Sequence, residues 1–173
     1  MPFIDKLLDC LLPLREKYPG FRWLSKDMLH ITTAFLGETD DKALPAVIEA
    51  VRAASVFPEI IGECGKLLTL PKNRPPNVLA IQIEKGGTVI AALAAETIRN
   101  LEVSGIIAGE KRRDFLPHIT LARGLTGNFS VKDEPPIVLE CVFKNLNVYE
   151  SKLSGQGARY SLLASFPLTG ANK

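Results

Sequence analysis

The stretch His30-Ile-Thr-Thr-Ala-Phe-Leu-Gly37 returns in shortened form downstream, as His118-Ile-Thr-Leu-Ala-Arg123. The chain contains two histidines, and each begins one copy of the pattern His-Ile-Thr-x-Ala. At average residue usage, agreement at the three following positions has a chance on the order of 10⁻⁴. The repeat therefore predicts two equivalent halves that bring two equivalent strands to one site.

Both copies have the composition of strands, because they are short, apolar, rich in β-branched residues and followed by a glycine. Side chains alternate between the two faces of a strand. The alternation places His30 beside Thr32, and His118 beside Thr120, each pair on one face. It turns Phe35 to the opposite face, where the residues alone predict a core position.

Hydrophobic spacing predicts the remaining elements. One helix is expected over 4–17, with a break at Pro13, and another over 88–101. Between them, a helix is expected that is capped by Thr39 or Asp40 and ends at Ala54. Strands are expected over 21–24, 60–70, 78–83, 137–148 and 158–166, with a loop over 149–155. The strands at 60–70 and 78–83 should form a hairpin, with a bulge at Gly62 or Gly65.

Length and charge limit the classes of protein and partner. The 173 residues suit a single domain, and a two-lobed domain fits equally well. A net charge of +2 is small for a protein that binds an extended polyanion, so a nucleic-acid partner should be short or held at one end. We expect a monomer.

The cysteines and the absence of long apolar runs predict a cytoplasmic protein. Cys10, Cys64 and Cys141 are widely spaced and include no Cys-x-x-Cys, which is typical of reduced thiols. The first residues carry Asp5 and Lys6 in a helical pattern, so no signal peptide is expected. No run approaches the length of a membrane span, and no membrane association is expected.

Two histidines with equivalent neighbours indicate acid–base chemistry. An imidazole titrates near pH 6.5, so a facing pair can hold one neutral and one protonated ring, as concerted general base and general acid catalysis requires. The hydroxyls of Thr32 and Thr120 can donate to phosphoryl oxygens. Two histidines without a nearby carboxylate or cysteine are too few ligands for a catalytic zinc, so no metal and no cofactor are predicted.

Two basic loops offer further contacts to phosphate. Arg74 lies in a proline-rich loop, and Lys111-Arg-Arg113 precedes the second motif. For Arg74 a solvated loop is the preferred interpretation, and for the basic run a solvated loop fits at least as well as a phosphate contact.

The paired motif, with the lead-in Arg22-Trp-Leu-Ser-Lys-Asp-Met-Leu29 and the closing Tyr149-Glu-Ser-Lys-Leu153 and Gly157-Ala-Arg-Tyr160, resembles the 2H phosphoesterase superfamily. Within it, the chain is similar to the RNA 2′,3′-cyclic phosphodiesterases, also called 2′-5′ RNA ligase-like or LigT-like proteins. The resemblance implies an α+β fold over 1–173, a single bilobal domain. Its two pseudo-symmetric lobes, each an antiparallel sheet with outer helices, would enclose a central cleft.

The resemblance also implies the site and the reaction. His30 and His118 would be the acid and base, Thr32 and Thr120 the phosphate ligands, and Phe35 with Arg123 the contacts to the terminal base. Strict alternation turns both Phe35 and Arg123 away from the other four, so a bend near the strand ends is needed.

The implied reaction is hydrolysis of a 2′,3′-cyclic phosphate to a 2′-phosphate, on RNA ends or on small cyclic nucleotides, with 2′-5′ ligation as the reverse. ADP-ribose 1″,2″-cyclic phosphate is a third substrate with the same five-membered ring. A non-catalytic module that binds nucleotides or RNA ends and a structural protein are the alternatives. Members of the family usually begin with a strand, whereas this chain starts almost directly in the first helix.

Overall fold

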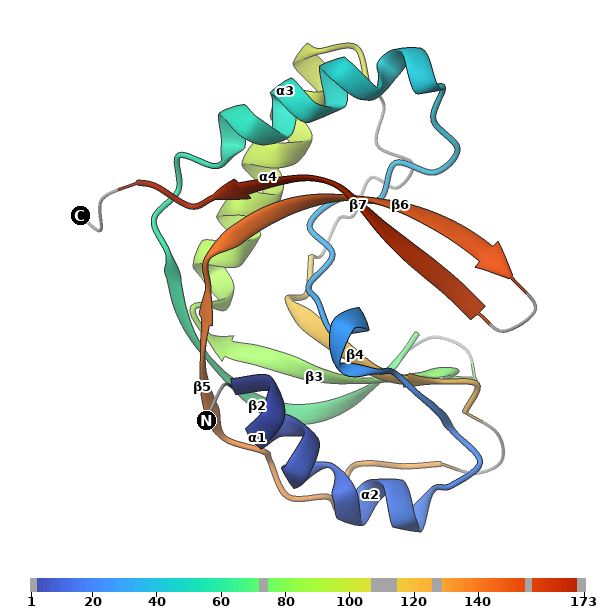
Figure 1. Ribbon diagram of the computed structural model, residues 1–173. Helices are drawn as coiled ribbons and strands as arrows, with labels where there is room; N and C mark the ends of the chain where they lie inside the picture. Colours follow the sequence, from blue (N-terminus) through green and yellow to red (C-terminus); the bar gives the residue numbers. More distant parts are fainter. Residues whose placement is uncertain (1–2, 72–74, 107–114, 126–128, 155–156, 171–173) are drawn as a thin grey trace. The chain divides into compact units, whose positions relative to one another are not determined.

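The computed structural model describes residues 3–71, 75–106, 115–125, 129–154 and 157–170 (Figure 1). The chain divides into two compact units, each assembled from three separate segments. Unit 1 consists of Met1–Thr32, Ile61–Gly87 and Leu116–Val142. Unit 2 consists of Thr33–Ile60, Thr88–Phe115 and Phe143–Lys173.

A five-stranded sheet forms the centre of unit 1, in the order β1-β4-β3-β2-β5. The pairings β1–β4, β4–β3 and β3–β2 are antiparallel. The strands are β1 (Arg22–Trp23), β2 (Ile60–Leu70), β3 (Val78–Lys85), β4 (His118–Arg123) and β5 (Leu139–Phe143). The predicted strand at 60–70 and its hairpin with the next strand are confirmed.

The predicted irregularity of β2 is present as register shifts between Glu63 and Leu67. Gly62 packs closely here, because a Cβ atom at this position would lie 3.1 Å from the Lys85 carbonyl oxygen and 3.2 Å from Cys141 Sγ. A glycine is thus required at position 62, because β3 and β5 lie too close to its backbone for a larger side chain.

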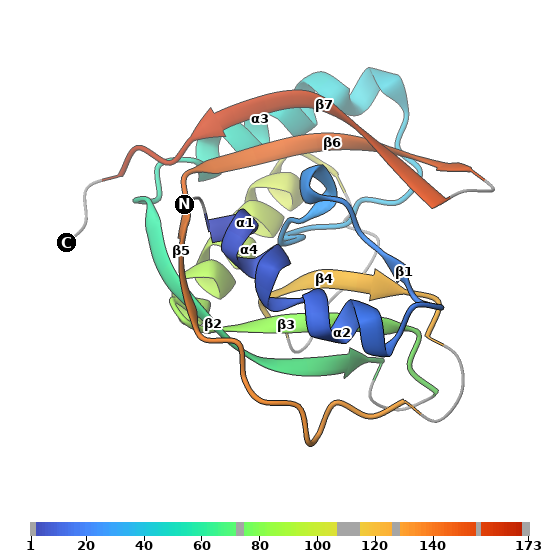
Figure 2. The same ribbon diagram turned by 60° about the horizontal axis from the view of Figure 1, so that its bottom comes forward.

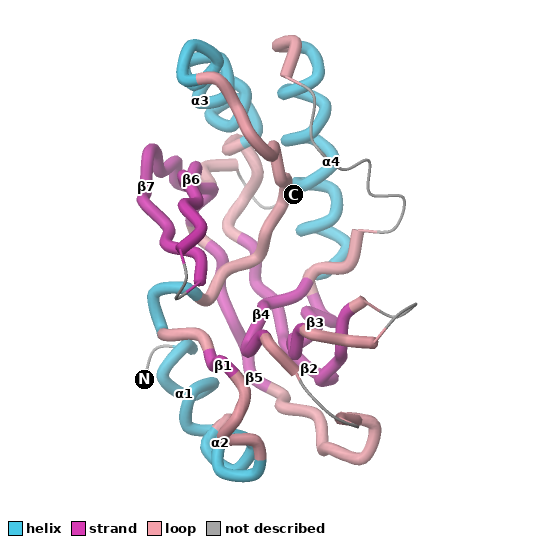
Figure 3. Tube along the Cα trace, turned by 90° about the vertical axis from the view of Figure 1, so that its right-hand side faces the viewer, coloured by secondary structure: helices cyan, strands magenta, loops and turns pink. Residues whose placement is uncertain are grey.

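Two short helices, α1 (Phe3–Cys10) and α2 (Leu12–Lys17), cover the apolar face of this sheet (Figures 2 and 3). The predicted break occurs at Leu11, since α2 begins with a proline in its first turn, where no amide hydrogen is needed. The buried residues of the helices are Leu7, Leu11 and Leu14, and those of the covered sheet face include Leu79, Ile81, Ile119 and Leu121. These side chains form the core of unit 1.

Unit 2 contains two helices and a long hairpin. The helices are α3 (Leu44–Ala54), which follows the 3-10 turn η2 (Asp41–Ala43), and α4 (Gly87–Val103), whose first residue belongs to unit 1. Asp40, one of the two predicted caps, accepts a hydrogen bond from Lys42 N at 2.9 Å and so caps η2, the turn that leads into α3. The N-cap of α3 itself is Ala43, which makes no side-chain cap. The hairpin pairs β6 (Asn145–Ser154) with β7 (Gly157–Pro167).

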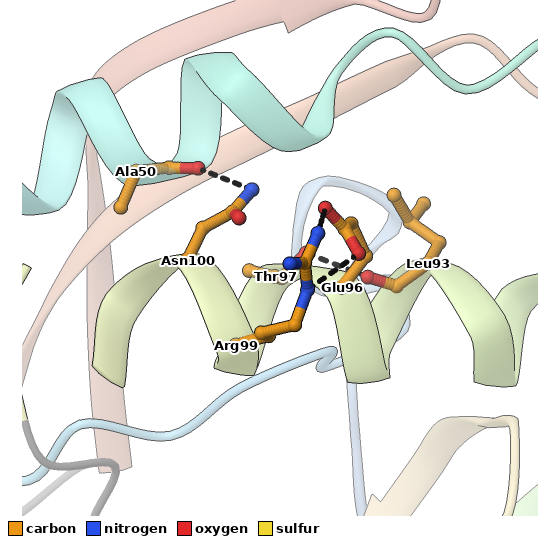
Figure 4. A network of polar contacts seen from close by, with 6 residues as sticks. All are labelled: Ala50, Leu93, Glu96, Thr97, Arg99 and Asn100. Atoms are coloured by element: carbon orange, nitrogen blue, oxygen red, sulfur yellow. Dashed lines mark hydrogen bonds and ion pairs between the residues drawn. The ribbon is translucent and has the colours of Figure 1, made fainter. Parts of the chain in front are cut away.

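One polar side chain of α4 contacts the other helix of unit 2, and further polar contacts lie within α4 (Figure 4). Asn100 Nδ2 donates to the carbonyl oxygen of Ala50 in α3 at 3.5 Å. The buried Thr97 hydroxyl donates to the Leu93 carbonyl oxygen within α4 at 2.8 Å. This bond satisfies a hydroxyl that is shielded from water.

The prediction of one continuous strand over 137–148 is wrong. The chain breaks at Lys144 into β5 and β6, which belong to different sheets. The loop predicted over 149–155 is also wrong, because β6 runs to Ser154 and pairs along its length with β7. The polar residues of this hairpin have a loop-like composition, and long-range pairing decides their conformation.

Candidate active site

The second motif forms β4 and has the predicted alternation over its first four residues. His118 and Thr120 are half-buried, whereas Ile119 and Leu121 are 3% and 1% exposed. The imidazole and the hydroxyl therefore share the face of the sheet opposite the apolar core. This part of the prediction is confirmed.

A β-bulge then changes the phase of β4. Ala80 of β3 pairs with Thr120, and the preceding Leu79 pairs with Ala122, so Leu121 is an extra residue without its own partner. Val78 pairs with Arg123.

The residues of β3 that pair with His118, Thr120 and Arg123 show how the bulge changes the direction of the Arg123 side chain. They are Gln82, Ala80 and Val78, which alternate along β3 and so project to one face. Arg123 consequently lies on the same face as the histidine and the threonine. Strict alternation is wrong at this strand end, and the bulge is the physical reason.

The first motif differs from the prediction. No strand is assigned to residues 29–37, which follow the 3-10 turn η1 (Lys26–Met28). A strand requires a hydrogen-bonded neighbour, and no strand in the described part of the chain pairs with this segment. Residues 30–34 are all half-buried, so the expected alternation of faces is absent as well.

Phe35 is 55% exposed, which corrects its expected place in the core. The core prediction depended on a strand with one buried face, and the segment is not such a strand.

Both histidines make the same contact with the backbone. His30 Nδ1 lies 2.8 Å from the carbonyl oxygen of Met28, and His118 Nδ1 lies 2.7 Å from that of Leu116. A carbonyl oxygen only accepts, so in each ring Nδ1 carries the hydrogen and donates it. In a neutral ring Nε2 is then the nitrogen that can accept a proton, and the contact orients the ring.

The structure assigns the candidate residues to units as follows. His30, Thr32, His118, Thr120 and Arg123 belong to unit 1, and Phe35 belongs to unit 2.

Two further observations bear on ligands. Arg74 and Lys111-Arg-Arg113 lie outside the described residues. Within the described ranges, no group of three or more His, Cys, Asp or Glu side chains could hold a metal ion.

Arg22 was not among the residues predicted for the site. It pairs with Arg123 across β1 and β4. The sequence signal for this residue was a charged side chain within a short apolar stretch. The pairing of β1 with β4 is needed to show which face of the sheet it occupies.

Comparison with known proteins finds similarity to phosphoesterases. Residues 5–80 match the model of the LigT like Phosphoesterase family, a stretch that includes the first motif and ends before the second. The chain is 27% identical over 154 residues to an RNA 2′,3′-cyclic phosphodiesterase of Thermotoga maritima, which covers 83% of this chain and 78% of that protein.

Solved structures share the fold. A protein of Thermus thermophilus superposes with a TM-score of 0.80 at 23% identity, covering 97% of this chain and 94% of that one. Escherichia coli LigT in complex with 3′-AMP superposes with a TM-score of 0.77 at 21% identity, covering 98% and 94%. The fold is therefore the α+β fold of the LigT structures.

These matches make the chain similar to the LigT-like phosphoesterases, the family that the motifs predicted. The relative from Thermotoga maritima is named as an RNA 2′,3′-cyclic phosphodiesterase. Among the described helices, none has the length and apolar character needed to cross a membrane.

Proposed function

We propose that the protein hydrolyses 2′,3′-cyclic phosphates at RNA ends or on nucleotides to 2′-phosphates, without a metal or cofactor. The observation that carries this proposal is the equivalent setting of the two histidines. Each is followed two residues later by a threonine, and each has its Nδ1 held by the carbonyl oxygen two residues earlier. Two imidazoles oriented alike through Nδ1 can both exchange protons through Nε2, one as base and one as acid.

In the proposed reaction, His118 removes a proton from water as the water oxygen attacks phosphorus. The bond between phosphorus and the 3′ oxygen breaks, and His30 donates a proton to that oxygen. The products are a 2′-phosphate and a 3′ hydroxyl. Thr32 and Thr120 donate hydrogen bonds to the two non-bridging oxygens, whose negative charge grows in the transition state. With the 5′ hydroxyl of a second RNA as the nucleophile in place of water, the same groups would support 2′-5′ ligation, in which the bond between phosphorus and the 3′ oxygen breaks in the same way.

The substrate is held beyond the phosphate by Arg123 and Phe35 in this proposal. The bulge supports the assignment of Arg123, because it brings the guanidinium to the face of His118 and Thr120. The exposed ring of Phe35 is available to stack on a base. Complexes of Escherichia coli LigT with 3′-AMP, NADP+ and ATP support a nucleotide as the ligand. We further propose that 1–173 acts as one bilobal, monomeric domain in the cytoplasm.

The decisive experiment is hydrolysis of a short RNA with a 2′,3′-cyclic phosphate end, in EDTA, from about pH 5 to about pH 9. Wild-type protein should form a 2′-phosphate with a bell-shaped pH profile, and His30→Ala and His118→Ala should each lose at least about 10² in rate. Turnover abolished by EDTA would instead indicate a metal and contradict the mechanism.

The alternative is a module that binds nucleotides or RNA ends without turnover. The nucleotide complexes of Escherichia coli LigT are compatible with it. It predicts that the cyclic end binds and is recovered intact, and that neither histidine variant changes the product.

A further inference from the structure

Arg22 lies on the same face of the five-stranded sheet as the second motif. In the pairing of β1 with β4, Arg22 stands directly opposite Arg123. Residues directly opposite in an antiparallel pair project to the same face, with Cβ atoms about 4.5–5.5 Å apart. Because Arg123 shares a face with His118 and Thr120, Arg22 shares it too.

The neighbouring residue confirms this orientation independently. The guanidinium carbon of Arg15, in α2, lies 5.5 Å from the centre of the Trp23 ring, and Trp23 Nε1 donates to the Tyr18 carbonyl oxygen at 3.1 Å. Trp23 therefore faces the helices and the core. Arg22, one residue earlier in the strand, faces the opposite side.

The two arginines form a cationic pair that costs stability in the absence of a ligand. Like charges directly opposite each other in a sheet are destabilising. Both residues are exposed, and the ion pairs found among the described residues include neither of them. An anion bound between or beside the two guanidinium groups would remove the repulsion, and their forked donors match the oxygens of a phosphate.

The position of the pair along the sheet indicates which phosphate it binds. Thr120 is in register with Ala80, and the two arginines are in register with Val78, two residues further along β3. Two residues of a strand span about 6.6 Å. A cyclic phosphate held by Thr120 would leave the outer guanidinium, that of Arg22, for a second phosphate.

We infer that Arg22 binds the phosphodiester that joins the cyclic terminal nucleotide to the nucleotide before it. The inference rests on the proposed function and extends it, because it makes RNA ends of two or more nucleotides better substrates than mononucleotides. Arg22 would act in binding only, without a part in proton transfer.

The test compares a dinucleotide ending in a 2′,3′-cyclic phosphate with a nucleoside 2′,3′-cyclic monophosphate. Arg22→Gln should raise KM for the dinucleotide about fivefold to tenfold and leave kcat unchanged. Both constants for the mononucleotide should stay at the wild-type values. The salt dependence of kcat/KM should become shallower for the dinucleotide alone, since one phosphate contact is lost.

The matched control is Lys85→Gln. Lys85 is an exposed cation at the opposite end of β3 from Val78, seven residues and about 23 Å along the strand, and its replacement should change the kinetic constants of neither substrate. Thermal unfolding without ligand provides a second readout. Arg22→Gln should melt at or above the wild-type temperature, because the repulsion with Arg123 is removed.

Equal effects of Arg22→Gln on both substrates, or no effect on either, would overturn the inference. A wild-type protein that hydrolyses neither substrate would instead contradict the proposed function. In that case binding of a dinucleotide 2′-phosphate and of a nucleoside 2′-monophosphate still tests Arg22, with a selective loss for the dinucleotide expected.

Discussion

Backbone carbonyl groups orient both proposed catalytic histidines. The donors are Nδ1 of His30 and of His118, and the acceptors lie two residues earlier in each case. Such a contact depends only on local sequence, so it survives although one motif is a strand and the other is not. Local geometry thus preserves the equivalence of the two motifs where secondary structure does not.

The Thr120 hydroxyl should stabilise the transition state. Thr120→Val should lower kcat/KM by about 10²–10³ and leave the thermal unfolding midpoint close to wild type, and Thr120→Ser should restore most of the activity. Steady-state kinetics on the cyclic phosphate measures the effect.

Thr69→Val is the control for Thr120. Thr69 pairs with Leu79 and so belongs to the opposite face of the same sheet. Its replacement should leave kcat/KM within about twofold of wild type. Equal losses in the two variants would assign the effect to the sheet as a whole and not to the hydroxyl.

A second prediction at this scale concerns Cys141. Burial raises the pKa of this thiol from its ordinary value of 9.0 to about 12. The folded state then keeps a proton that the unfolded chain releases, so stability present below pH 9 is lost as the pH rises toward 12. One pKa unit corresponds to about 1.4 kcal/mol, which makes about 4 kcal/mol the upper limit of the loss.

Urea unfolding of wild type, Cys141→Ala and Cys10→Ala at several pH values between about 8 and 11 tests this effect. The free energy of unfolding should fall less steeply with pH in Cys141→Ala than in wild type. The exposed Cys10 is the control, and its replacement should leave the slope unchanged. Identical slopes in all three proteins would contradict the prediction.

At the scale of elements, α1 stabilises unit 1 by burying the side chain of Leu7. Leu7 is 0% exposed, whereas Leu12, the first residue of α2, is 53% exposed. Leu7→Ala should reduce the free energy of unfolding by about 2–5 kcal/mol, through lost burial and the cavity that remains. Leu12→Ala, the same substitution outside the core, should change it by less than about 0.5 kcal/mol.

Chemical denaturation monitored by Trp23 fluorescence distinguishes the two leucine variants. A similar small change in both would mean that α1 contributes little to the stability of the sheet it covers. A large change in both would place Leu12 in a contact that its exposure does not indicate.

At the scale of the whole molecule, both histidines belong to the same compact unit of one chain. A mixture of His30→Ala and His118→Ala proteins should therefore remain inactive, because neither chain carries both groups. Hydrolysis of the cyclic phosphate after mixing the variants measures this, with sedimentation giving the oligomeric state. Recovery of activity on mixing would show that two chains together supply one site, and would contradict the proposed monomer.

Much of the secondary structure could be predicted because its causes are local. The helix break near Pro13, the cap at Asp40 and the extent of β2 follow from propensity, capping and hydrophobic period. The loop predicted within β6 failed because its polar residues carry no local strand signal. All ten residues of β6 pair with β7, and this pairing forms only once the two segments meet in the folded chain.

The sequence by itself determined the repeated His-Ile-Thr-x-Ala motif, the chemistry that two such motifs can perform and the elements around them. Only the tertiary structure decided which further side chains join His118 and Thr120 on their face of the sheet. The bulge at Leu121 brings Arg123 beside His118 and Thr120, and the pairing of β1 with β4 adds Arg22. Register and bulges depend on strands distant in the chain, so no local pattern specifies them. For the same reason the first motif, without a paired strand among the described residues, has no strand despite its composition.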